Sequence, residues 1–565
     1  MMEKQQMTRG TETAGGAGLR HCEIRNGELV RYFGDATELA VPDYVTTIAA
    51  DAFRGCRRLT DLALGRNVTS IHAGAFRDCV RLRRVAMPSG LREIGDYAFR
   101  GCRSLSAVLL PRSVYSVGVG AFQDCAALKK VCLSAELQHL GGFAFAGCEA
   151  LEEVALPETL TAIHRSTFFR CHSLRRVTVP EGIQTVGSYA FAQCGALEEL
   201  PLAQTVTYIG RGALSECRAL RSFRIPQRVR YLGNHLFSCC EALEEVQLPD
   251  TVTAFGDYAF CDCKSLARLQ LPAALTRIGQ GCFLHCAALQ ELSLPAGVTA
   301  IGKGAFAYCT GLRSVTLSEG LTALEAETFR ACLSLKEIRL PDGIRWMGER
   351  AFERCIALES VHVPRNLERL GDSAFAECAL VSVSLPSTLC SIGERAFADC
   401  YWLDTVLLPN RRAWIGVGAF AGCTALEVLV VPDGLLFPGR KRERWRVPAR
   451  AQMIYHSELE ISLLFAELAS SDTPEDRKTE LRQEIRQRLR QLRRRSAAPH
   501  PAPDGPPQVP DAADASPDAA NASLDAAEDS REAPGAAEEG TAKAAPAPQE
   551  LPQAESRGAE RRQED

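Results

Sequence analysis

Cysteine is the residue type in this chain with the most regular spacing and the most available chemistry. The 565 residues include 23 cysteines, and 17 of them recur in one register, which we call the cysteine ladder. The first fourteen intervals are 23 residues long, the next is 22 and the last is 23 again. The ladder consists of Cys56, Cys79, Cys102, Cys125, Cys148, Cys171, Cys194, Cys217, Cys240, Cys263, Cys286, Cys309, Cys332, Cys355, Cys378, Cys400 and Cys423.

Buried free thiols explain this ladder better than metal ligands or disulfides do. A metal site needs clustered ligands such as Cys-x-x-Cys pairs, and the chain offers only Cys239-Cys240 and Cys261-x-Cys263. Disulfides need pairs, but thiols at one position of identical units do not pair naturally and 17 is an odd number. Free Cys packs as a small hydrophobe and is typical of a reducing compartment. The sequence predicts no metal site and no cofactor.

Catalytic motifs are not evident in the sequence. The ten histidines lie at scattered positions instead of converging on one group. The chain has no phosphate-binding loop, Gly-x-Ser-x-Gly or His-Glu-x-x-His motif. An enzyme in the C-terminal region is disfavoured because residues 433–495 offer no nucleophile paired with a base. We therefore expect a protein that is not an enzyme.

The ladder belongs to a repeated phrase whose consensus is Cys-x-x-Leu-x-x-Val-x-Leu-Pro-x-x-Val-x-x-Ile-Gly-x-x-Ala-Phe-x-x-Cys. The alternation at Val-x-Leu predicts a short strand, and the Pro ends that strand because it has no N–H. Gly allows a turn that a Cβ would hinder, while Phe and Cys complete the apolar side. One unit cannot bury its few apolar residues alone, so the units must stack into a solenoid.

This phrase resembles the leucine-rich repeats of the BspA-like type over about residues 22–432. The resemblance implies a leucine-rich repeat solenoid with a parallel β-sheet on one face and a mostly irregular or short-strand opposite face. It also implies a binding protein, and members of this family are usually surface or secreted proteins.

Four segments follow from the repeat and from composition. Residues 1–18 are predicted to be a disordered N-terminus, and residues 19–432 a solenoid of about 17 repeats. The solenoid begins with a hairpin cap that turns at Asn26-Gly27, a strong two-residue hairpin signal. Residues 433–495 are predicted to form a C-terminal cap with basic amphipathic helices, and residues 496–565 a disordered acidic Ala/Pro-rich tail.

The cap contains two apolar stripes at helical spacing. The first stripe is Ile461, Leu464, Phe465 and Leu468, and the second is Leu481, Ile485, Leu489 and Leu492. The second helix is expected to open with Thr473 as its N-cap and Pro474 at its first position. Its stripe is expected to pack on the solenoid end or on a partner helix.

Charge argues against nucleic acid as the partner of the solenoid. Residues 474–495 carry 9 bases and 4 acids, whereas residues 1–473 carry 51 bases and 50 acids. The solenoid therefore has no field to steer a polyanion. For the basic helix, an acidic partner, RNA, an anionic membrane surface and the acidic tail stay open as alternatives to packing on the solenoid.

Two columns of side chains supply the candidate partner-binding residues. In the first, glutamate returns every 46 residues just before the central apolar residue of the strand, with Arg or Ser between. Stacking would place Glu beside Arg or Ser, which either stabilises the sheet or forms a polar binding surface. The second column precedes the Ile of Ile-Gly and is aromatic at four positions, where Tyr208 and Tyr231 would stack on adjacent units. The candidates are Glu153, Arg176, Glu199, Glu245, Arg268, Glu291, Glu337, Tyr208, Tyr231 and Trp346.

Together these observations predict a non-enzymatic binding platform, most simply an intracellular scaffold for a protein partner. The alternative is an adhesin-like protein that binds host protein or glycan. The chain has no run of 18 or more apolar residues, so no transmembrane segment is expected. The first residues lack the apolar segment of a secretory signal, which predicts the cytoplasm, with the cell surface or non-classical secretion as the alternative.

Overall fold

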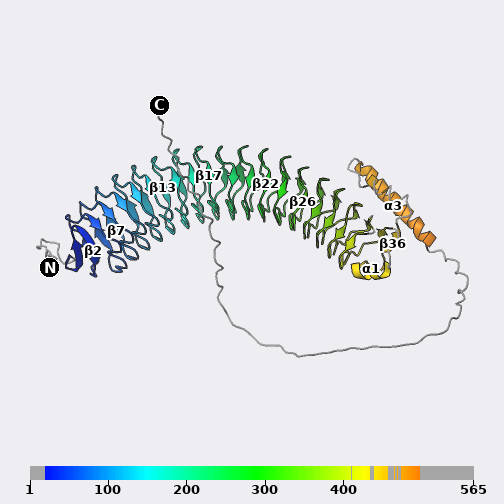
Figure 1. Ribbon diagram of the computed structural model, residues 1–565, viewed down its shortest axis with the longest axis horizontal. Helices are drawn as coiled ribbons and strands as arrows, with labels where there is room; N and C mark the ends of the chain where they lie inside the picture. The colour runs from blue at the N-terminus through cyan, green and yellow to red at the C-terminus, as the bar shows by residue number, and fades with distance from the viewer. Residues whose placement is uncertain are drawn as a thin grey trace, which may run out of the picture. The chain divides into compact units, whose positions relative to one another are not determined.

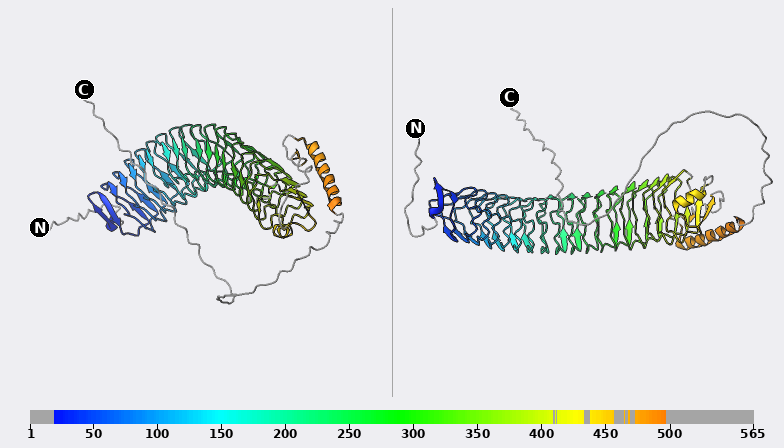
Figure 2. Two further views of the ribbon diagram at one scale, coloured as in Figure 1. Left: turned by 45° about the vertical axis from the view of Figure 1, so that its right-hand side comes forward. Right: turned by 90° about the horizontal axis from the view of Figure 1, so that it is seen from below.

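The computed structural model describes residues 19–408, 410, 412–432, 438–455, 464, 467, 468 and 473–496. All of these belong to one compact unit, residues 1–497. Successive coils of the chain stack side by side along a curved row (Figure 1), and Figure 2 shows the same row from two further sides. The predicted N-terminal segment, the tail beyond Ser496 and the positions Ile461, Phe465 and 433–437 lie outside the described residues.

Nearly all coils contribute one strand to each of two parallel rows. The long-strand row contains strands of three or four residues, which are β3 (Glu38–Ala40), β5 (Asp61–Ala63), β7 (Arg84–Ala86), β9 (Ala107–Leu109), β11 (Lys130–Cys132), β13 (Glu153–Ala155), β15 (Arg176–Thr178), β18 (Ser222–Arg224), β20 (Glu245–Gln247), β23 (Glu291–Ser293), β25 (Ser314–Thr316), β27 (Glu337–Arg339), β29 (Ser360–His362), β31 (Ser382–Ser384), β33 (Thr405–Leu407), β35 (Val428–Val431) and β36 (Gln452–Tyr455).

The short-strand row contains two-residue strands on another side of each coil. These are β4 (Thr47–Ile48), β6 (Ser70–Ile71), β8 (Glu93–Ile94), β10 (Ser116–Val117), β12 (His139–Leu140), β14 (Ala162–Ile163), β16 (Thr185–Val186), β17 (Tyr208–Ile209), β19 (Tyr231–Leu232), β21 (Ala254–Phe255), β22 (Arg277–Ile278), β24 (Ala300–Ile301), β26 (Ala323–Leu324), β28 (Trp346–Met347), β30 (Arg369–Leu370), β32 (Ser391–Ile392) and β34 (Trp414–Ile415). The fold of the coils that the structure describes is therefore the leucine-rich repeat solenoid expected from the sequence.

The long-strand row is not one continuous sheet. It divides into separate hydrogen-bonded sheets, among them β9–β11–β13–β15 and β18–β20. The coil between these two sheets carries Pro201 directly after Leu200, and it forms no strand there. Proline has no N–H to donate to the neighbouring strand, so it interrupts the ladder of hydrogen bonds.

The core is a stack of equivalent side chains from successive coils. Phe rings three residues before each ladder cysteine stack face to face, with ring centroids 5.3 Å apart for Phe260 and Phe283 and 5.4 Å apart for Phe283 and Phe306. Leu214 takes the Phe position in one coil and is equally buried. Along the strands, the central residue points inward and its two neighbours point outward, as in Glu291, Leu292 and Ser293.

A third segment of each coil, just before the ladder cysteine, also bonds to the next coil. In one such turn the backbone N–H groups of Gly304, Phe306 and Tyr308 donate to carbonyl oxygens of the following coil at 2.7–2.9 Å. Both Gly304 and Tyr308 have positive φ, 61° and 59°. A left-handed conformation is unfavourable for a residue such as Tyr, so the inter-coil hydrogen bonds must stabilise it.

The glycine after each Ile was expected to allow a turn, but the structure shows that it allows neighbouring coils to approach closely. At Gly302 a Cβ would lie 2.4 Å from the backbone nitrogen of Gln280 in the preceding coil. The φ of Gly302 is not in the left-handed region. Glycine is needed here because the backbones of neighbouring coils approach closely, and a side chain would push them apart.

Both ends of the stack are covered. The predicted hairpin is present as β1 (Cys22–Arg25) and β2 (Glu28–Tyr32), an antiparallel pair that turns at Asn26-Gly27 and pairs in parallel with β4. At the other end, α1 (Pro438–Trp445) takes the place of a further coil. Its last residue, Trp445, accepts a hydrogen bond from the Phe420 N–H at 3.0 Å, as a residue of the next coil does elsewhere. Strand β36 pairs with β35 and extends the long-strand row.

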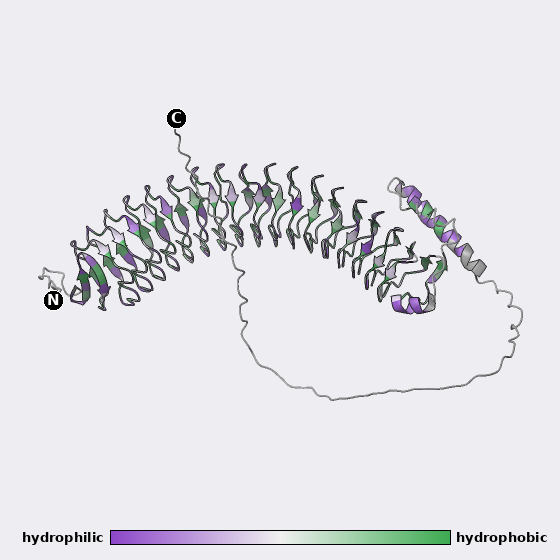
Figure 3. Ribbon diagram, in the orientation of Figure 1, coloured by the Kyte–Doolittle hydropathy of each residue, from purple (hydrophilic) through white to green (hydrophobic). Residues whose placement is uncertain are grey.

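Helix α3 (Glu475–Ser496) completes the C-terminal cap. It begins at Glu475, and Thr473 donates its hydroxyl to Glu467 O at 2.6 Å instead of capping the helix as predicted. Figure 3 shows hydrophilic and hydrophobic residues following one another along the described part of α3. Of the predicted stripe, Leu481 and Ile485 are buried, while the side chains of Leu489 and Leu492 lie outside the described residues.

Candidate functional site

The cysteine ladder is buried from Cys79 to Cys423, whereas its first member, Cys56, is half-buried. From Cys79 to Cys423, every ladder thiol donates to the carbonyl oxygen of the Phe or Leu 25 or 26 residues earlier, at 3.0–3.3 Å. The Phe283 carbonyl, for example, accepts from the Cys286 N–H and from the Cys309 thiol, both at 3.1 Å. Each thiol thus connects two coils, a role that its small size alone did not predict.

Burial also makes these thiols chemically inert. It raises the pKa of Cys309 to about 12 and that of Cys217 to about 12, because a thiolate would be desolvated. Reactivity requires the thiolate, so these groups are not nucleophiles at neutral pH. In the described part of the chain no cluster of three or more His, Cys, Asp or Glu side chains could hold a metal ion.

The glutamate column lies on the outward side of the long-strand row. Every member from Glu153 to Ser360 is exposed. In coils that form a long-row strand, each glutamate lies opposite the predicted neighbour in the adjacent strand. The pairs are Glu153 with Arg176, Glu245 with Ser222, Glu291 with Ser314 and Glu337 with Ser360. Glu199 and Arg268 are exposed but lie in coils without a long-row strand.

Although the glutamates of this column lie next to Arg or Ser of neighbouring coils, they form no salt bridges with them in the described structure. Among the described residues, no ion pair joins Glu153, Glu199, Glu291 or Glu337 to a base, and Glu245 accepts only from Gln247 Nε2, at 3.3 Å. A purely stabilising role for the column would need such pairs, because exposed charges contribute little unless they meet. The carboxylates are therefore available to a partner.

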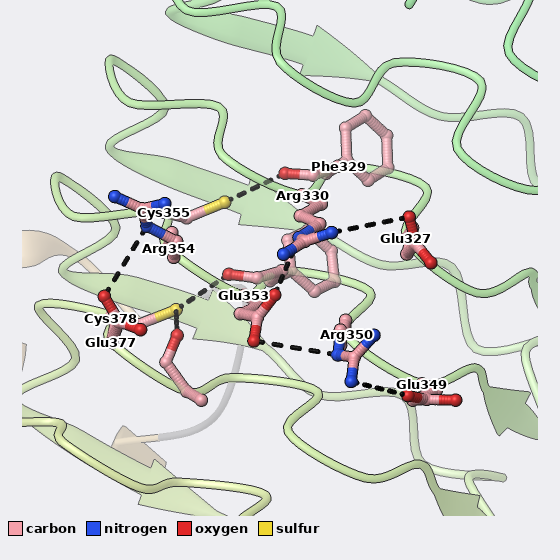
Figure 4. Close-up of polar contacts among 12 residues, drawn as sticks. Glu327, Phe329, Arg330, Glu349, Arg350, Glu353, Arg354, Cys355, Glu377 and Cys378 are labelled. Carbon is pink, nitrogen blue, oxygen red and sulfur yellow. Dashed lines mark hydrogen bonds and ion pairs between the residues drawn. The ribbon is translucent and has the colours of Figure 1, made fainter. Parts of the chain in front are cut away.

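The turn segments before the ladder cysteines show the opposite arrangement (Figure 4). Arg330 Nε lies 2.7 Å from Glu353 Oε2, and Arg350 and Glu327 extend this cluster across neighbouring coils. Arg354 pairs with Glu377 of the next coil at 3.6 Å. The charged side chains of these turns already form ion pairs within the protein. The glutamate column, which forms none, is therefore the better candidate for binding.

We expect Glu353→Gln to lower the free energy of unfolding by about 1 kcal/mol, since it leaves two arginines facing a neutral amide in a partly buried cluster. Urea denaturation of both proteins measures the effect. Glu158→Gln, at an exposed turn position, is the matched control and should change stability by less than about 0.5 kcal/mol. Equal effects of the two substitutions would show that the cluster contributes no stability.

The aromatic column is exposed but does not form the predicted stack. Tyr208 and Tyr231 are 53% and 46% exposed, and Trp346 is 38% exposed. However, β17 and β19 belong to different sheets, and no ring contact joins the two tyrosines in the described structure. The Tyr231 hydroxyl donates instead to Asn234 Oδ1 at 2.8 Å, while that oxygen accepts from Asp257 N in the next coil. This hydrogen bond ties the Tyr231 hydroxyl to its own coil and, through Asn234, to the next one.

Helix α3 occupies the outward face of the long-strand row at its C-terminal end. Ile485 packs with Leu407, Val428 and Val430, and Arg486 Nη2 lies 2.7 Å from Asp404 Oδ2. In other coils the outward positions are mostly polar, whereas here they are apolar and buried. That change from polar to apolar was readable in the sequence and marks where the helix docks. The predicted packing of this stripe on the solenoid end is confirmed for Ile485.

Comparison with known proteins finds one matching family model and several similar solved structures. The family model described as BspA type leucine-rich repeat region (6 copies) matches residues 31–152, 138–267, 231–358 and 345–437. A leucine-rich repeat protein from Bacteroides ovatus is 24% identical and covers 76% of this chain and 94% of that one, with a TM-score of 0.45. The T. pallidum leucine-rich repeat protein is 31% identical over 30% of this chain and 82% of that one, with a TM-score of 0.29. A leucine-rich cell surface protein from Faecalibacterium prausnitzii is 20% identical over 71% and 89%, with a TM-score of 0.33.

No curated protein matches the sequence. A membrane-spanning segment would need a long apolar helix, and none of the helices that the structure describes meets that requirement.

Proposed function

Because the chain belongs to the BspA-type leucine-rich repeat family, whose members commonly serve as binding platforms, we propose that it is a non-enzymatic platform for a protein partner. The proposal rests on one observation above all: a row of exposed glutamates at fixed spacing that forms no ion pairs within the described protein. A rigid solenoid presents such a row without the entropic cost of ordering flexible loops.

The contact that this surface supports is broad and polar. Glutamates alternate with Arg176, Arg268 or Ser, so the row offers carboxylates to a partner's basic groups and sets a register along the stack. Outward neighbours two residues later in the strands, such as Gln247 and Ser293, are also exposed and polar. Such a surface lacks an apolar centre, and its affinity should fall as salt screens the charges over about 8–10 Å.

Charge reversal on this row tests the site. The double variant Glu245→Lys with Glu291→Lys should weaken the binding of a partner captured by residues 1–495 by about tenfold or more, because like charges would then face each other. The fold should survive, since both side chains point outward from their strands. Isothermal titration at two salt concentrations measures both the loss and the salt dependence.

Two matched double variants make the result specific. Glu158→Lys with Glu319→Lys gives the same change in net charge at exposed positions outside the row and should leave affinity unchanged. Tyr208→Ala with Tyr231→Ala tests the aromatic column as the rival site. If the tyrosine variant abolishes binding and the glutamate variant does not, the glutamate row is not the binding surface.

We also propose an intracellular scaffold as the setting, with a surface or secreted adhesin that binds host protein or glycan as the alternative. The 23 cysteines are free thiols, and reduced cysteines persist in reducing compartments. Cell fractionation with protease treatment of intact cells distinguishes the two. Protection of the protein from the protease supports the scaffold, and its cleavage supports the adhesin.

A further inference from the structure

A groove of about 770 Å³ lies near the C-terminal end of the solenoid, at the one coil that is a residue shorter than the others. Here Cys378, Ala379 and Leu380 follow one another directly, whereas other coils have two residues between Cys and Leu. Ala379 and Val381 of this short coil line the groove, and we call it the short-coil groove.

The missing residue explains why the surface is hollow at this point. The coils before and after it keep the full length and carry larger side chains, Ile356 and Trp402, which also line the groove. These two side chains stand on either side of the short coil in stacking order. Ile356 is 59% exposed and Trp402 is 69% exposed, so a large apolar wall faces solvent here. Exposed aromatic walls around a recess are typical of interaction sites.

The C-terminal side of the groove carries three arginines beside two carboxylates, those of Asp404 and Glu427. Arg450 follows Trp402 and Ala425 in stacking order, and Arg486 and Arg490 come from α3. Arg486 pairs with Asp404, but neither Arg450 nor Arg490 forms an ion pair with a residue that the structure describes. The other carboxylates that line the groove are Glu359, at the apolar end, and Glu427.

We propose that the short-coil groove binds an extended peptide of a protein partner, which inserts a large apolar side chain between Ile356 and Trp402 and places carboxylates next to Arg450 and Arg490. The apolar walls supply burial, and the two arginines supply charge-assisted hydrogen bonds to carboxylates. None of the glutamates of the row lines this groove, and the inference does not rest on that row.

Selection from a random displayed peptide library on the full-length protein tests this inference, with the Trp402→Ser variant as the counter-target. We expect the enriched peptides to share a large apolar residue with Asp or Glu close to it. A fluorescein-labelled copy of the most enriched peptide should bind Trp402→Ser about 30-fold more weakly and Arg450→Ala with Arg490→Ala about tenfold more weakly. Fluorescence anisotropy gives both affinities.

Tyr401→Ser is the matched control, because Tyr401 is an exposed aromatic in the same coil that does not line the groove. It should bind the peptide as the unchanged protein does. Inserting Ser between Ala379 and Leu380 restores the common coil length and should abolish binding while the melting temperature is retained. If no selected peptide depends on Trp402, or if the enriched peptides are basic instead of acidic, the inference is wrong. The glutamate-row variants leave this peptide's affinity unchanged, so the two proposals fail separately.

Discussion

Replacing Phe283 by Ala should lower the free energy of unfolding by about 3–5 kcal/mol, the range found for buried aromatic residues. The ring is fully buried and stacks on Phe260 and Phe306, so the substitution removes contacts with two coils at once. Neighbouring coils cannot collapse into the space, because backbone hydrogen bonds of the short-strand row and of the turns before the ladder cysteines hold their spacing. In a solenoid the stability is a sum over neighbouring coils, so a weak interface in the middle uncouples the two halves.

Urea denaturation followed by circular dichroism measures this loss, together with any separation of the transition into two steps. Tyr208→Ala is the control, because it removes an aromatic ring of similar size from an exposed position and should cost less than about 0.5 kcal/mol. A loss below about 1 kcal/mol for Phe283→Ala would show that the Phe stack does not hold the coils together.

The buried thiols should react with a thiol reagent at least about a thousandfold more slowly in the native protein than in urea. Reaction requires the coil to open, which costs a large part of the free energy of unfolding, at least about 5 kcal/mol. Burial raises the pKa of most ladder thiols, as for Cys309 and Cys217, so these thiols also lack the thiolate that reacts.

Mass mapping of the labelled cysteines provides its own control within the chain. Cys132 and Cys390 are exposed and should be labelled first, whereas Cys79 to Cys423 of the ladder should be labelled last. Disulfides between successive ladder positions would contradict the free-thiol ladder and would indicate an oxidising compartment.

The same shift predicts how stability depends on pH. A ladder thiol with a folded pKa above its ordinary value of 9.0 stays protonated in the native state while the unfolded chain loses its proton. The stabilisation is therefore complete below about pH 9 and is lost as pH rises toward the folded pKa. Because many thiols share this shift, the protein should unfold cooperatively in moderate alkali.

The sequence alone determined the length of each coil and the residues that form its core. A period of 23 residues, with Phe and Cys at fixed places and a two-residue alternation before Pro, shows which side chains are apolar and where each strand must end. Asn26-Gly27 likewise specified the hairpin, and the spacing of Leu481 and Ile485 specified the buried side of α3. All of these are local patterns, because turn chemistry and hydrophobic periodicity act within a few residues.

The tertiary structure decided what each repeated position contacts. The ladder thiols bond to carbonyls 25 or 26 residues away, and Arg486 meets Asp404 across 82 residues. Tyr308 adopts a left-handed backbone because the next coil receives its N–H, and the Tyr231 hydroxyl donates to Asn234, which also accepts from the next coil. A one-residue deletion is visible in the sequence, but the groove it leaves exists only when full-length coils with large side chains stand on both sides. Such contacts depend on how successive coils stack, and no local pattern within one coil encodes that arrangement.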